Sequence, residues 1–271
     1  METDEPARKW VVAGHSDIQT QLRLFCFPYA GAGASIFREW ERELPAAIQL
    51  CRVQLPGREE RLHERPLAHV TDITSALVYD LQPWLDRPFV FFGHSMGALI
   101  AFELARELRR LRAPLPQRLF LSGRPAPHIK SRMSVIHHLP DSEFKRELGR
   151  LNGTRTKVLD DTELMTLLMP MLRADFSVCE TYVCSPGEPL PIPITVLGAI
   201  TDAYVWRQDL EGWRAYTSDT MKLLMFPGDH FYLHPMRSQL IAAVICDLAP
   251  ALFAAPTRLD CRESRAEPDR A

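Results

Sequence analysis

The sequence predicts an α/β domain in which a mostly parallel sheet is flanked by helices. First, short apolar runs alternate along the chain with segments of helical periodicity. Second, several of these runs are apolar throughout, as expected of strands that are buried on both faces. Third, the chain has 271 residues, 46% hydrophobic and 24% charged, which suffices for one large domain.

The predicted strands and helices follow one another in regular order. The strands are residues 22–27, 48–55, 89–92, 119–122, 194–198 and 223–226. The helices are residues 35–43, 73–85, 98–111, 207–216 and 237–248. Because connections between parallel strands are right-handed, this alternation predicts a doubly wound sheet.

One connection is far longer than the others. About 70 residues separate the strand ending at Ser122 from the next one, whereas ordinary α/β connections are much shorter. Phe144, Leu148 and Leu151 share one helical face there, so we expect a helical lid over the sheet edge where ligands bind. The predicted organisation is an N-terminal extension (1–20), a core (21–123 and 188–254), a helical lid (124–187) and a flexible C-terminal tail (255–271).

A serine lies between two glycines where a strand is predicted to turn into a helix. Residues 93–97 read Gly-His-Ser-Met-Gly and directly follow the apolar run 88–92. Side chains at the flanking positions of such a tight turn would collide with neighbouring elements, and Gly93 and Gly97 avoid that collision. The pattern predicts the nucleophile elbow of an α/β-hydrolase fold, with Ser95 exposed at the sheet edge.

A serine hydroxyl becomes a good nucleophile near neutral pH only with a base in reach and a group that orients that base. In α/β-hydrolases the chain order is Ser, then Asp or Glu, then His, and both partners follow later strands. Asp202 follows the strand at 193–198, and His230 follows the strand at 222–226. We therefore predict a catalytic triad of Ser95, His230 and Asp202.

Other histidines and acids fit these roles less well. His234 lies on the same loop as His230, beside a proline, and remains an alternative base. Asp229 is adjacent to the base and badly placed to reach around its ring, while Asp209 lies inside a predicted helix. His94 precedes the nucleophile, so we expect it to point away from Ser95 and to act as a packing residue.

The predicted reaction develops negative charge on an oxygen, which two backbone N–H groups would stabilise. One donor is expected from Met96, the residue after the nucleophile. The other is expected from Ala30, in the loop of small residues at 27–34. A phosphate-binding glycine loop is the alternative, but no Gly-Lys-Ser/Thr follows, and Ile36 occupies the third glycine position of a dinucleotide-binding fingerprint.

Composition excludes several other classes. The formal net charge of −2 argues against nucleic acid as a partner. The longest apolar segment, 240–255, is too short for a membrane span, and the charged N-terminus does not resemble a signal peptide, so we expect a cytoplasmic protein. The cysteine spacing indicates neither a zinc site nor a disulfide framework, and Cys26 and Cys51 are expected to be buried hydrophobes.

These residues together resemble a type II thioesterase, the free-standing thioesterase that serves polyketide, nonribosomal peptide or fatty acid synthases. The resemblance extends from about Leu24 to Leu248. Two positions depart from the pattern: Tyr29 stands where many bacterial relatives have His, and Ala203 where many have Pro. The blocks that carry the resemblance are CFPYAGAGAS (26–35), QLPGRE (54–59), FFGHSMGA (91–98), LRADF (172–176) and FPGDHFYL (226–233).

The resemblance implies an enzyme that hydrolyses acyl thioesters on the phosphopantetheine arm of acyl or peptidyl carrier proteins, in editing or in chain release. It places the family's triad on Ser95, Asp202 and His230, and its oxyanion amides on Ala30 and Met96. It implies no cofactor and no metal, and we expect a monomer. A carboxylesterase or lipase, or an acyltransferase with the same triad, remains an alternative.

Carrier proteins of this kind are usually acidic, so a docking surface for them would be cationic. The alternative for each candidate residue is an ordinary solvated charge. In the LRADF block, an ion pair of Arg173 or Asp175 is expected to hold the lid. The candidate docking residues are Arg58, Arg61, Arg65, Lys130, Arg132, Lys145 and Arg146.

Overall fold

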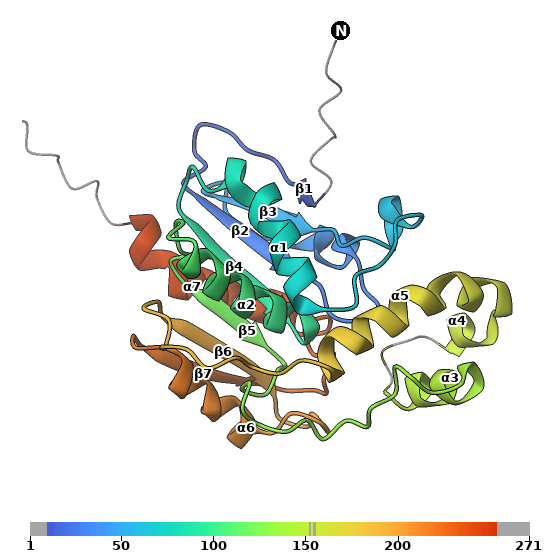
Figure 1. Ribbon diagram of the computed structural model, residues 1–271. Helices are drawn as coiled ribbons and strands as arrows, with labels where there is room; N and C mark the ends of the chain where they lie inside the picture. Colours follow the sequence, from blue (N-terminus) through green and yellow to red (C-terminus); the bar gives the residue numbers. More distant parts are fainter. Residues whose placement is uncertain (1–9, 152, 154–155, 254–271) are drawn as a thin grey trace, which may run out of the picture.

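The sheet observed in the computed structural model runs through the middle of the molecule (Figure 1). The model describes residues 10–151, 153 and 156–253, and within these residues seven strands form one sheet in the order β1-β3-β2-β4-β5-β6-β7. β1 pairs with β3 in antiparallel fashion, and every other neighbouring pair is parallel. The strands are β1 (Val11–Ala13), β2 (Leu22–Phe27), β3 (Ile48–Val53), β4 (Phe89–His94), β5 (Leu119–Ser122), β6 (Ile194–Ala199) and β7 (Met221–Phe226).

The central strands are buried along their whole length. Every residue of β2, β4, β5 and β6 is buried, which is why their sequences are mostly apolar and do not alternate with polar residues. β7 lies at the edge of the sheet, and Phe226 is its one buried residue. The predicted strands therefore match the structure, apart from their exact ends.

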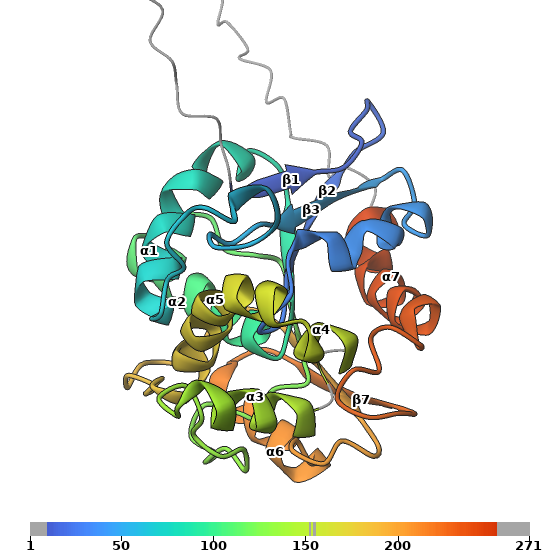
Figure 2. The ribbon, with the colours of Figure 1, turned by 90° about the vertical axis from the view of Figure 1, so that its right-hand side faces the viewer.

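Helices cover both faces of the sheet, as Figure 2 shows. One face packs against α1 (Val70–Leu81) and α2 (Met96–Arg110), whose apolar side chains join the larger core cluster. The other face packs against the 3-10 helix η1 (Ala34–Arg42) and α7 (Arg237–Phe253). Shorter helices complete the core: η2 (Glu59–Arg61), η3 (Gln82–Trp84), α6 (Arg207–Glu211) and η4 (Gly212–Tyr216).

In the described part of the long connection between β5 and β6, which was predicted as a lid, there are three helices. They are α3 (Asp141–Arg150), α4 (Thr156–Asp160) and α5 (Thr162–Glu180), and Figures 1 and 2 show them together on one side of the sheet. They enclose a small core of their own that includes Phe144, Leu148 and Phe176. The fold is therefore the predicted α/β-hydrolase fold with a helical insertion.

Several elements differ from the prediction. The predicted helices 73–85 and 207–216 are each an α-helix followed by a 3-10 helix, α1 with η3 and α6 with η4. The helix predicted at 35–43 is the 3-10 helix η1 (Ala34–Arg42) rather than an α-helix. β1 lies within the segment 1–20, where no strand was expected, and pairs Val11 with Val53 of β3. β1 has only three residues, which is too short for a reliable alternation pattern. Residues 1–9 of the predicted extension and the predicted tail 255–271 lie outside the described residues.

Candidate active site

The nucleophile elbow predicted from the sequence is present between β4 and α2. Ser95 has φ 53° and ψ −110°, a conformation that a non-glycine residue adopts only under local constraint. Its N–H donates to the carbonyl oxygen of Ser122 on the neighbouring strand (2.8 Å), and α2 begins at Met96. The positive end of the α2 dipole therefore lies next to the Ser95 side chain.

Gly93 and Gly97 are needed at the elbow because backbone approaches them too closely for any side chain. A Cβ atom on Gly93 would lie 2.1 Å from the carbonyl oxygen of Gly97. A Cβ atom on Gly97 would lie 2.0 Å from the carbonyl oxygen of Phe27. Both contacts are with backbone, which cannot move aside as a flexible side chain can.

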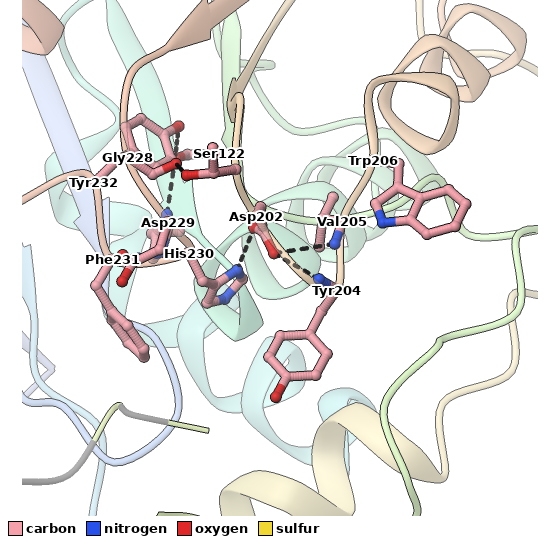
Figure 3. Close-up of polar contacts among 12 residues, drawn as sticks. Ser122, Asp202, Tyr204, Val205, Trp206, Gly228, Asp229, His230, Phe231 and Tyr232 are labelled. Atoms are coloured by element: carbon pink, nitrogen blue, oxygen red, sulfur yellow. Dashed lines mark hydrogen bonds and ion pairs between the residues drawn. The ribbon is translucent and has the colours of Figure 1, made fainter. Parts of the chain in front are cut away.

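The structure brings together His230 and Asp202, which the sequence analysis assigned as base and orienting acid. Nδ1 of His230 lies 2.7 Å from Oδ2 of Asp202 (Figure 3). The other carboxylate oxygen of Asp202 accepts hydrogen bonds from the N–H groups of Tyr204 (2.8 Å) and Val205 (3.1 Å). These two bonds hold the carboxylate although Ala203 replaces the proline expected in relatives.

The loops that carry these two residues are also bonded to each other. The N–H and the hydroxyl group of Thr201 both donate to the carbonyl oxygen of Gly228, at 3.1 and 2.7 Å. The N–H of Ile200 donates to the carbonyl oxygen of Phe226 (2.8 Å). The ends of β6 and β7 are thus joined, which fixes the distance between the two loops.

Asp202 is kept ionised by its neighbours. Burial alone would raise the pKa of its carboxyl group, but the hydrogen bond from His230 and those from the Tyr204 and Val205 N–H groups outweigh it. The net effect is a pKa below the usual value for Asp. An ionised Asp202 therefore faces the His230 ring and fixes a proton on Nδ1, leaving Nε2 as the basic nitrogen.

A cavity of about 410 Å³ contains both Ser95 and His230 in its wall. The helical insertion supplies much of the remaining wall, including Leu148, Leu172 and Phe176. These apolar side chains are typical of a site for a small organic group. The cavity thus lies between the end of the sheet and the insertion.

Ala30 and Met96, the predicted oxyanion donors, belong to the loop after β2 and to the start of α2. Ala30 lines the cavity, and Met96 is the first residue of α2. Within the described residues, neither backbone N–H donates a hydrogen bond to another protein group. Met96 is fully buried and follows Ser95 directly, and nearly all buried backbone donors are paired, so its unpaired N–H suits a ligand oxygen.

His94 is buried as expected of a packing residue, but it does not lie apart from the site. Its ring centroid is 5.1 Å from that of His230. Its Nδ1 atom lies 2.8 Å from Oγ of Ser122, which lies 2.6 Å from the hydroxyl oxygen of Tyr232. Burial, and then the charge of His230, lower the pKa of His94 well below its usual value. Sequence reasoning missed this network, since Ser122 and Tyr232 have no signature of their own.

The rival residues have other partners. Nε2 of His234 lies 3.0 Å from the hydroxyl oxygen of Tyr29, which itself lines the cavity. Asp229 is exposed and accepts a hydrogen bond from the N–H of Phe231. Asp209 pairs with Arg132. The described geometry therefore supports His230 and Asp202 rather than these alternatives.

The predicted docking role is wrong for Arg58 and Arg61, because both residues are buried. Only 4% of Arg58 and 7% of Arg61 is exposed. Arg58 pairs with Asp175, and Arg61 pairs with Glu64 at 2.6 Å. The sequence does not show whether a charged residue pairs within the protein or faces solvent. Both of these arginines pair within the protein.

The LRADF block makes two ion pairs, with different partners. Arg173 pairs with Asp141 at the start of α3 (2.6 Å), within the insertion. Asp175 pairs with Arg58, which connects α5 to the core. Asp175 also accepts a hydrogen bond from the N–H of Gly31, next to Ala30. The expected ion pairing is present, but the pairing of Asp175 with Arg58 was not predicted.

Among the described residues, no helix is both long enough and apolar enough to cross a membrane. Cys26 and Cys51 are buried free thiols, as expected, and burial raises the pKa of Cys51 to about 12.

The fold and the site define a hydrolase of the serine type. Comparison with known proteins then identifies the family. The chain belongs to the thioesterase domain family, whose model matches residues 22–247. This match, together with the relatives described next, confirms the resemblance to type II thioesterases.

Three relatives illustrate the similarity. The gramicidin S biosynthesis protein GrsT of Aneurinibacillus migulanus is 47% identical over 233 residues, which cover 86% of this chain and 91% of GrsT. RedJ, a thioesterase of the prodiginine pathway in Streptomyces coelicolor, superposes with a TM-score of 0.80 at 36% identity, covering 87% of this chain and 94% of RedJ. YbtT, a type II thioesterase of the yersiniabactin NRPS/PKS pathway, superposes with a TM-score of 0.82 at 31% identity, covering 90% of this chain and 100% of YbtT.

Proposed function

We propose that this enzyme hydrolyses acyl thioesters on the phosphopantetheine arm of acyl or peptidyl carrier proteins, with Ser95, His230 and Asp202 as its triad. The observation that carries the proposal is the hydrogen bond between His230 and Asp202 at a cavity that also contains Ser95. The names of relatives from peptide and polyketide pathways support the choice of substrate.

The first half of the reaction transfers the acyl group to the enzyme. His230 Nε2 takes the proton of the Ser95 hydroxyl group while Oγ attacks the thioester carbonyl carbon. The carbonyl oxygen becomes an oxyanion, which the N–H groups of Ala30 and Met96 stabilise. The C–S bond then breaks, and His230 returns the proton to the departing pantetheine sulfur.

The second half releases the acyl group. Water enters, His230 removes one of its protons, and the resulting hydroxide attacks the acyl carbon on Ser95. The tetrahedral intermediate uses the same two amides. Collapse frees the carboxylic acid, and Ser95 regains its proton from His230. These steps require no metal or redox cofactor, and phosphopantetheine belongs to the substrate.

The remaining exposed cations suit a carrier-protein surface. Arg65, Lys130, Arg132 and Arg146 are exposed, and Lys145 is partly exposed. Arg132 is already paired with Asp209, so its charge is partly neutralised. We propose that Lys145 and Arg146, on α3 of the insertion, contribute to docking of an acidic carrier. Arg58 and Arg61 have no part in this proposal.

A comparison of three substrates that carry the same acyl group tests the proposed function. They are an octanoyl carrier protein, octanoyl-pantetheine and an octanoyl ester of a simple alcohol. We expect the highest kcat/KM for the carrier protein, and a loss of roughly 10⁴-fold or more in Ser95→Ala. A large preference for the simple ester would instead indicate a carboxylesterase or lipase. Transfer of the octanoyl group to an added alcohol or amine, in preference to water, would indicate an acyltransferase.

Two further proposals concern the protein as a whole. We propose a cytoplasmic location, because carrier-protein synthases supply the substrate there. We also propose a monomer, which size-exclusion chromatography with light scattering would test directly. Neither proposal affects the assignment of the triad.

A further inference from the structure

The loop that carries Ala30 is held by two residues from distant parts of the chain. The carboxylate Oδ2 of Asp175, on α5, accepts a hydrogen bond from the N–H of Gly31 (2.7 Å). The guanidinium Nη1 of Arg58, just before η2, donates to the carbonyl oxygen of Ala32 (2.9 Å). The two residues that follow Ala30 are therefore both tied to charged side chains.

Arg58 and Asp175 also bind each other through two parallel hydrogen bonds. Nη1 of Arg58 lies 2.8 Å from Oδ2 of Asp175, and Nη2 lies 2.7 Å from Oδ1. Both side chains are almost fully buried, with 5% and 1% of their surface exposed. Such a bidentate pair fixes direction as well as distance, which a single contact to a flexible cation would not.

Backbone geometry makes the loop dependent on this support. Gly31 has φ +83°, and a Cβ atom there would lie 2.9 Å from a methyl carbon of Leu172 on α5. The N–H of Ala32 donates to the carbonyl oxygen of Tyr29 (3.0 Å), which closes a tight turn around Ala30. A small shift of α5 would therefore move the turn and redirect the Ala30 N–H.

A separate contact holds the far end of the loop. Gln54 accepts a hydrogen bond from the N–H of Ala34 (2.8 Å) and donates to the carbonyl oxygen of Arg58 (3.0 Å). Gln54 thus anchors the start of η1 and the backbone of Arg58. The turn next to Ala30 is contacted by the Arg58 and Asp175 side chains, so these two govern its orientation.

We propose that Arg58 and Asp175 are positioning residues for the oxyanion hole. Together they hold the Ala30 amide in line with that of Met96, and this alignment depends on how α5 packs against the loop. The inference rests on the proposed function, in which Ala30 supplies an oxyanion donor. It gives a role to two of the sequence blocks, QLPGRE and LRADF, that the triad does not use. Neither residue lies in the triad, and neither donates a proton in the reaction.

The test compares Asp175→Asn and Arg58→Lys with the unmodified enzyme. Steady-state hydrolysis of octanoyl-pantetheine gives kcat and KM. Affinity for an octyl trifluoromethyl ketone reports on the oxyanion hole, because Ser95 adds to its carbonyl carbon and leaves an oxyanion there. Affinity for the matching thioether, which lacks a carbonyl group, reports on binding without the hole. Near-ultraviolet circular dichroism establishes that each variant is folded.

We expect kcat to fall by about 10- to 100-fold in both variants, while KM changes by less than about threefold. The ketone should lose affinity by about the same factor as kcat, and the thioether should keep its affinity. Asp141→Asn is the matched control, since it breaks another ion pair of α5, with Arg173, and does not touch the loop. Its kcat should stay within about twofold of the unmodified value.

The inference is overturned if a folded Asp175→Asn chain keeps its kcat, or if ketone and thioether lose affinity equally. If Asp175→Asn does not fold, Arg58→Lys decides by the same criteria, because lysine keeps the charge but cannot form the bidentate pair. Absence of thioester hydrolysis in the unmodified enzyme would count against the proposed function instead. The two failures are thereby distinguished.

Discussion

Nδ1 of His230 lies 2.7 Å from Oδ2 of Asp202, although 28 residues separate them in the chain. The contact depends on the parallel pairing of β6 and β7, which brings the ends of both strands to one edge of the sheet. The contact fixes the proton on Nδ1 of His230. It leaves Nε2 to accept the proton of the Ser95 hydroxyl group. The proposed chemistry follows from this orientation.

Replacing Asp202 with asparagine should therefore damage catalysis while leaving the fold intact. An amide can donate to Nδ1 and favour the wrong tautomer of His230, so we expect kcat to fall by about 10⁴-fold. Steady-state kinetics with octanoyl-pantetheine would measure the loss. Asp229→Asn is the control, because Asp229 is exposed beside the base, and its kcat should remain close to the unmodified value. Equal effects of the two substitutions would contradict the assignment.

The elbow glycines should be intolerant of any side chain. Gly93→Ala places a Cβ atom 2.1 Å from a backbone oxygen, so we expect destabilisation of more than about 4 kcal/mol, or failure to fold. Gly149 offers a matched comparison, because it is exposed on α3 and the nearest atom to an added Cβ is 3.5 Å away. Gly149→Ala should be stabilising by about 0.5–1 kcal/mol. Urea unfolding would measure the stability of both variants. A stable Gly93→Ala chain would contradict the close backbone packing at the elbow.

His94 should make the protein less stable as the pH falls. Burial keeps it neutral in the folded state, whereas the unfolded chain takes up a proton below about pH 6.5. Protonation thus favours unfolding: the effect is absent above about pH 6.5 and grows below it. In His94→Gln the dependence should weaken by up to about 1.4 kcal/mol per pH unit.

Urea unfolding at several pH values between about 7.5 and 5 would measure this dependence. His15→Gln is the control, because His15 is exposed, and its stability should follow that of the unmodified protein. A slope that is identical in His94→Gln and the unmodified protein would show that His94 does not resist protonation in the fold.

Charge reversal on α3 should affect carrier-bound substrates selectively. We expect Lys145→Glu with Arg146→Glu to lower kcat/KM for octanoyl carrier protein by about 3- to 10-fold at low salt, because acidic carriers are steered by positive charge. Hydrolysis of octanoyl-pantetheine should not change. Arg110→Glu, at the far end of α2 from Ser95, should change neither. A loss that is equal for both substrates would contradict a docking role for α3.

The sequence alone predicts the sheet and the three triad positions. Ser95 directly follows β4, and Asp202 and His230 lie a few residues beyond the ends of β6 and β7. Because parallel strands end at the same edge of the sheet, residues in these positions are brought close together. Asp202 lies beside His230 although the proline at 203 is missing, because the N–H groups of Tyr204 and Val205 hold its carboxylate.

The sequence could not predict which charges are internal. Arg58 and Asp175 are 117 residues apart, and neither has a periodic pattern that indicates burial. Arg58 therefore resembled a surface cation until the fold placed α5 against its loop. The same reason applies to His94, Ser122 and Tyr232, whose hydrogen bonds join three separate segments around His230.

Covalent labelling of Ser95 tests the central claim most directly. A fluorophosphonate reacts with an activated serine, and peptide mass spectrometry locates the adduct. We predict one adduct per chain, on Ser95, its loss in Ser95→Ala, and labelling slower by at least about 100-fold in His230→Ala. Labelling at another residue, or an unchanged rate without the imidazole, would show that Ser95 is not activated by His230.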